Sequence, residues 1–147
     1  MRFTKLVGAL LAVFIFSSTG VVAEMKTHNV AFHVYQNDKG LMNLALNNIE
    51  NMVKHYEAKG EKVTIELIAY GPGLNIFIDG KSPVVARIEA MSLGIENLTF
   101  AAFGNTHSKM SKKTGKEIKL LDGVTMTSSG VVRLVELQEQ GYAYIRP

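Results

Sequence analysis

Segments typical of buried strands alternate with segments of helical periodicity along most of this chain. Residues 28–36 (HNVAFHVYQ), 62–70 (KVTIELIAY) and 98–103 (LTFAAF) are short, apolar, β-favouring runs that end at turn residues. Between the first two runs, apolar residues in 41–59 recur every three or four positions, as on one face of a helix. This alternation predicts one α/β domain with a mainly parallel central sheet and helices on both faces.

The second half of the chain continues the same pattern. A helix is expected over residues 83–93, with Ser82 before it and Gly94 after it. The expected sheet has about five strands. Its remaining segments are a short helix over 106–113, a strand over 124–127, a helix over 131–140 capped by Ser128 or Ser129, and a strand over 142–145.

The first residues have the pattern of a secretory signal peptide. Two basic residues precede the apolar run LVGALLAVFIF, and small residues at Val21 and Ala23 suit a cleavage site. The run is shorter than the ~20 residues that span a membrane, although a retained anchor is the alternative interpretation. We therefore expect residues 1–23 to be removed, leaving one domain over residues 24–147 in the periplasm, without a stable membrane anchor.

Composition and failed motifs exclude several functions. The chain has no cysteine, which excludes disulfides and thiolate chemistry. The GKS at residues 80–82 lacks the upstream glycine of a phosphate loop, because Asn75 stands there, and the GPG at 71–73 lacks the third glycine of a dinucleotide fingerprint. Without the signal peptide the charges nearly balance, and no aromatic residues are interleaved with the lysines of 109–119. Neither a nucleotide cofactor nor a nucleic-acid partner is expected.

The histidines do not have the spacing of a metal site. No two of the four are separated by four residues, and His28 and His33 fall on opposite faces of one strand. His33 is expected to be a hydrogen-bonded core residue. His107 follows a strand end and is either a solvated helix residue or a proton carrier and anion contact. The lysines of 109–119 are likewise either a solvated surface or an attraction for an anion.

Several segments together resemble one known family. They are MNLALNNIENM (42–52), YGPG (70–73), FAAFGNT (100–106) and above all SSGVVRLVELQEQGYAYIRP (128–147), which are similar to the DsrE/DsrF-like family. The resemblance implies a small α/β fold, assembly into homotrimers or homohexamers, and a link to sulfur metabolism. It also implies a sulfur-carrier cysteine at the end of the third strand, where this chain has Phe103. Phenylalanine can form no persulfide, so the usual sulfur relay is excluded.

These observations favour a noncatalytic binding or accessory module, not an enzyme. Carboxyl ends of parallel strands gather at one edge of a sheet, where a small anion or a sulfur-containing ligand is expected to bind. One alternative is an oligomerisation partner of cysteine-bearing relatives, suggested by the asparagines at 43, 47 and 51. The other is an enzyme that uses Asp38, His107, Thr106 or Ser128. The ligand-binding residues predicted at the strand ends are Asn37, Asp38, Gly71, Gly73, Phe103, Gly104, Asn105, Thr106, His107 and Ser128.

Overall fold

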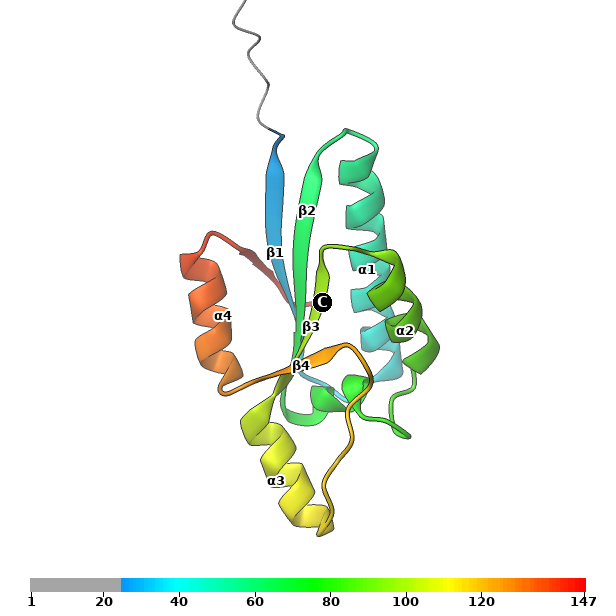
Figure 1. The fold of residues 1–147 in the computed structure, drawn as a ribbon, viewed down its shortest axis with the longest axis vertical. Coiled ribbons are helices and arrows are strands. Elements are labelled where there is room, and N and C mark those ends of the chain that lie inside the picture. Colours follow the sequence, from blue (N-terminus) through cyan, green and yellow to red (C-terminus); the bar gives the residue numbers. More distant parts are fainter. Residues whose placement is uncertain (1–24) are drawn as a thin grey trace, which may run out of the picture.

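The fold is a five-stranded parallel sheet flanked by helices (Figure 1). The computed structural model describes residues 25–147, so the predicted signal peptide at 1–23 lies outside the described residues. Every strand pairs in parallel with its neighbours, in the order β4-β3-β2-β1-β5. This confirms the predicted α/β class and parallel sheet. The strands are β1 (Thr27–Val34), β2 (Lys62–Ala69), β3 (Leu98–Phe103), β4 (Val124–Thr127) and β5 (Ala143–Ile145).

Helices cover both faces of the sheet and the carboxyl ends of its strands. In Figure 1, α1 (Lys39–Glu57) and α2 (Val85–Gly94) lie on one face and α4 (Gly130–Glu139) lies on the other. The helix α3 (Gly104–Thr114) and the 3₁₀ helix η1 (Gly71–Phe77) lie beyond the carboxyl ends of the strands. No helix among residues 25–147 is long and apolar enough to cross a membrane.

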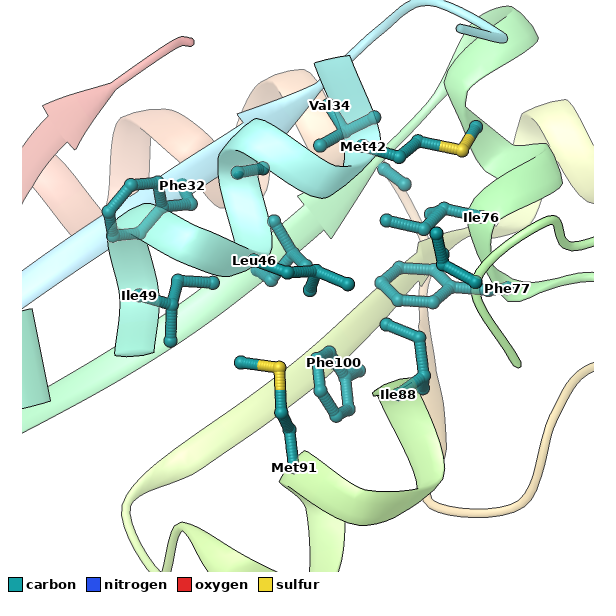
Figure 2. Packing of buried hydrophobic residues seen from close by; sticks show 14 of the residues in the cluster. Phe32, Val34, Met42, Leu46, Ile49, Ile76, Phe77, Ile88, Met91 and Phe100 are labelled. Carbon is teal, nitrogen blue, oxygen red and sulfur yellow. The ribbon is translucent and has the colours of Figure 1, made fainter. Parts of the chain in front are cut away.

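Alternating side chains divide the strands between two apolar clusters. Phe32, Leu67 and Phe100 point towards α1 and α2, where they join the main core shown in Figure 2. The opposite face carries a smaller cluster beneath α4. Its buried members are Ala31, Ile68, Ala101, Phe103, Leu134 and Leu137.

The first residues of two helices differ from the sequence prediction by two residues, for identifiable reasons. The helix α1 begins at Lys39, before the predicted Leu41, because the carboxylate of Asp38 accepts a hydrogen bond from the amide of Leu41 at 2.7 Å. The helix α3 follows β3 directly, beginning at Gly104 where Thr106 was predicted. Gly104 permits this sharp turn, because a Cβ there would lie 2.8 Å from the carbonyl oxygen of Thr127.

Candidate functional site

A groove lies at the carboxyl ends of β1, β2 and β3, where the sequence predicts ligand binding. Its volume is about 490 Å³, and we call it the carboxyl-edge groove. It combines the loop between β1 and α1, the first turns of η1 and one side of α3. The predicted residues Asn37, Gly71 and Thr106 line it together with Pro72, Asn75, Lys109, Met110 and Lys113.

Two glycines shape this groove by letting η1 approach the end of β1. Gly71 has a φ of 56°, which favours glycine. A Cβ on Gly73 would overlap the carbonyl oxygen of Val34 and lie 2.7 Å from its carbonyl carbon. The backbone of the GPG segment is therefore pressed against β1 in a way that a side chain at residue 73 would prevent.

The amides of these two glycines bond within the chain. The N–H of Gly71 donates to Oγ1 of Thr106 at 3.1 Å, and the N–H of Gly73 lies 3.1 Å from the carbonyl oxygens of both Tyr35 and Tyr70. Both glycines are among the predicted ligand-binding residues, but their amides already have partners within the chain. In the structure the polar groups that line the groove are instead asparagine, threonine and lysine side chains.

Two lysines give the groove a positive charge. Lys109 and Lys113 are four residues apart on α3, so they share one face of the helix. Neither forms an ion pair within the described chain, and none of the groove-lining residues is acidic. The groove can therefore attract a small anion through charge and bind it through the amide and hydroxyl groups of its wall.

Phe103 lies beneath α4, not in the groove. Its side chain is only 6% exposed, and its ring lies 4.9 Å from that of Tyr70. A Cβ on Gly130 would overlap the ring of Phe103, so the first residue of α4 is packed directly on it. Phe103, which stands where the sequence resemblance implies a cysteine, is thus part of the second apolar cluster.

The groups considered for acid–base chemistry are not hydrogen-bonded to one another. Asp38 caps α1, and Thr106 accepts from Gly71. His107 is buried, with Nε2 2.6 Å from the carbonyl oxygen of Ile118, and lines a different groove of about 380 Å³. Ser128 and Asn105 are exposed. Among residues 25–147, no group of three His, Asp or Glu side chains is placed to hold a metal ion.

Sequence reasoning missed a group of residues on the α4 face, which we call the histidine cluster. It consists of His33, Tyr35, Tyr70, Tyr144 and Arg146. His33 is 2% exposed, as its interpretation as a core residue requires, and its Nδ1 lies 2.7 Å from the hydroxyl of Tyr144. Its Nε2 has no hydrogen-bond partner among the described residues. Burial, and secondly the charge of Arg146, lower the pKa of His33 to about 4.

The tyrosines surround the histidine. The rings of His33 and Tyr70 stack with centroids 4.3 Å apart, and the guanidinium of Arg146 lies 4.9 Å from the ring centroid of Tyr35. The only sequence signal for this cluster is the aromatic content of three strand ends, HVY, AY and AYIR. That signal does not show that the three ends lie side by side.

The asparagine face of α1 has one structural role. Oδ1 of Asn43 accepts from Arg87 of α2 at 2.9 Å, which links the two helices, whereas Asn47 and Asn51 are exposed. One asparagine of this face is therefore bonded to a neighbouring helix, and the other two face solvent.

Comparisons with known proteins identify the fold. MTH1491, a protein of unknown function from Methanobacterium thermoautotrophicum, is 30% identical, with a TM-score of 0.68, and the match covers 82% of this chain and 99% of that one. The ychN protein from E. coli is 12% identical, with a TM-score of 0.58, over 84% of this chain and 99% of its own. Both have DsrE/DsrF-like folds. No protein-family model and no curated protein matches the chain.

Proposed function

Because the chain belongs to the same family as MTH1491 and shares its DsrE-like fold, we propose that it is an exported, noncatalytic module that binds a small oxyanion. The binding site is the carboxyl-edge groove, and the protein works in the periplasm after removal of residues 1–23. The resemblance to sulfur-relay proteins makes an oxidised sulfur anion the first ligand class to test.

The observation that supports this function is that Lys109 and Lys113 line one groove together with amide and hydroxyl groups. Charge-assisted hydrogen bonds from lysine to an oxyanion are stronger than neutral ones. Amides and hydroxyls add directional contacts, here from Asn37, Asn75 and Thr106. With no acidic residue in the wall, an anion meets no like charge there.

Titration with sulfate, thiosulfate and phosphate at low ionic strength tests the proposal. Isothermal calorimetry and the NMR shifts of backbone amides measure the binding. We expect saturable shifts around Thr106, and we expect the double variant K109A/K113A to bind roughly tenfold to a hundredfold more weakly. The control is K112A/K116A, because both of these lysines are exposed and outside the groove. Equal weakening in the two double variants, or no saturable binding, would contradict the assignment.

The outer face of α4 supports a second role, self-assembly into a homotrimer or homohexamer. Val131, Val132 and Val135 are exposed there, while Leu134 and Leu137 of the same helix are buried against the sheet. Contiguous exposed apolar side chains of this kind mark association surfaces. Mixed assembly with cysteine-bearing relatives through the same face is the alternative.

Native mass spectrometry separates these possibilities. A charge placed in an apolar interface is costly, so V135K should shift the assembly towards monomer. L93K is the control, because Leu93 is also exposed but lies at the end of α2. A wild-type chain that is monomeric alone and does not associate with its relatives would exclude both forms of assembly.

A further inference from the structure

The histidine cluster lies at the carboxyl ends of β1, β2 and β5, on the α4 face of the sheet. The register pairs Ala31 with Tyr144, so His33, two residues after Ala31, projects from the same face. Tyr70 connects this group to Phe103, whose ring forms the adjoining apolar surface. The three strand ends thus place one imidazole, three phenols and one guanidinium together.

The hydrogen bonds of the cluster are incomplete. A buried polar group without a partner destabilises a fold, so such atoms are rare in native proteins. Nε2 of His33 is such an atom, because it is buried and has no partner in the described chain. A group from outside the chain that bonds to Nε2 therefore removes a penalty as well as adding a contact.

The protonation of the neighbours decides what kind of group can bond there. Burial lowers the pKa of His33 to about 4, so its imidazole is neutral near pH 7. Burial raises the pKa of Tyr144, which keeps its hydroxyl protonated. In the tautomer of His33 that lets this hydroxyl donate to Nδ1, the imidazole proton is on Nε2. Nε2–H is then a donor and requires an acceptor.

The charges around this donor favour an anionic acceptor. Arg146 is exposed and carries a positive charge beside His33 and Tyr35. Glu66 is the buried carboxylate of the described chain, and it is bonded to Arg133 through two hydrogen bonds of 2.9 and 2.6 Å. The negative charge of Glu66 is thus already paired, and the cluster presents a cation and neutral donors.

The flat surfaces of the cluster restrict the ligand further. The ring of Tyr70 is stacked on His33 and contacts Phe103, and Arg146 lies over Tyr35. Guanidinium groups bind planar carboxylates through two parallel hydrogen bonds, and aromatic rings favour a planar apolar body. Tyr144 is 41% exposed, so the cluster is open to solvent along β5.

We propose that the histidine cluster is a second ligand site, which binds a small planar organic carboxylate. Its carboxylate accepts from Nε2–H of His33 and from the guanidinium of Arg146, and its flat body packs on Tyr35 and Tyr70. The ligand enters along β5, where Tyr144 is exposed. This site is separate from the carboxyl-edge groove and does not depend on the groove's function.

Benzoate is the probe for a direct test on the ¹⁵N-labelled protein. Long-range ¹H–¹⁵N spectra report which imidazole nitrogen of His33 carries the proton. We expect Nε2 to be protonated and its resonance to shift saturably with benzoate. R146M should weaken binding roughly tenfold or more, and R146K should recover only part of the loss, because lysine lacks the bidentate geometry. K109A/K113A should bind benzoate like the wild type.

Several results would overturn this assignment. One is no saturable change at His33 up to tens of millimolar benzoate. Another is an unchanged benzoate affinity in R146M, whose substitution at an exposed residue near the chain end should not impair folding. Equal or tighter binding of sulfate at His33 would refute the planar carboxylate. Loss of benzoate binding in K109A/K113A would place the ligand in the groove instead.

Discussion

Replacing Gly130 by alanine should destabilise the fold through Phe103. A Cβ at residue 130 would overlap Cε2 and Cδ2 of the Phe103 ring, and the ring is enclosed by the second apolar cluster. Overpacking of this kind costs about 1–3 kcal/mol. Alanine in a helix is normally about 0.5–1 kcal/mol better than glycine, so steric overlap must outweigh an intrinsic gain. We expect G130A to lose roughly 1–2 kcal/mol of unfolding free energy.

A double-mutant cycle separates the overlap from any other effect of the substitution. F103A alone should cost about 3–5 kcal/mol, because it leaves a cavity beneath α4. In the F103A background the ring is absent, so adding G130A should be neutral or slightly stabilising. The resulting coupling energy between residues 103 and 130 should be about 1–3 kcal/mol.

Urea unfolding followed by circular dichroism measures all four chains of this cycle, provided that the m-values agree. G94A is the control, because Gly94 also belongs to a helix, has no unusual φ, and a Cβ there would meet nothing within 4 Å. We expect G94A to be neutral or slightly stabilising. A G130A variant as stable as wild type, or additive effects of G130A and F103A, would refute the packing argument.

Three further predictions follow from the same structure. G73A should cost more than G130A, because its Cβ would overlap backbone atoms of Val34, which cannot rotate away; failure to accumulate as folded protein, set against normal G94A, would be the clearest result. D38A should cost about 0.5–2 kcal/mol through loss of the α1 cap, without changing the affinity of the groove for sulfate; a large affinity change would instead assign Asp38 to the ligand. The pKa of His33 is about 4 in the folded chain and 6.5 ordinarily, so between these values the unfolded state binds the extra proton. The free energy of unfolding should therefore fall by roughly 2–3 kcal/mol as the pH falls from 6.5 to 4, and the contribution of His33 should change little below pH 4. Urea midpoints of the wild type and of H33Q across this range measure that contribution.

Local sequence signals predicted the elements of this fold because strands and helices leave different periodicities. The strands β1, β2 and β3 match the runs at 28–36, 62–70 and 98–103 to within two residues at each end. The 3₁₀ helix η1 was missed, because GPGLNIF has no helical periodicity long enough to detect. The structure brings Asn37, Gly71 and Thr106 together in one groove at the strand ends, and their binding role stays a prediction.

Long-range contacts account for what the sequence does not show. Nothing local to Phe103 indicates that Gly130, 27 positions later, lies on its ring, or that the strand ends at His33, Tyr70 and Tyr144 converge. The bonds made by the Gly71 and Gly73 amides are equally invisible, since they depend on how η1 packs against α3 and against the end of β1. Sequence patterns therefore predict which edge of the sheet is available, but not which of its donors are already bonded.

The relation between Phe103 and Gly130 bears on the strand end where the family resemblance implies a sulfur-carrier cysteine. If Phe103 had no packing role of its own, the first position of α4 could hold any residue. Instead that position holds Gly130, and the ring of Phe103 fits there only because glycine has no side chain. Phe103 is thus a packing residue that closes the end of β3 beneath α4. Replacing Phe103 by cysteine would leave a cavity in the second apolar cluster, and the two ligand sites that we propose lie on either side of Phe103.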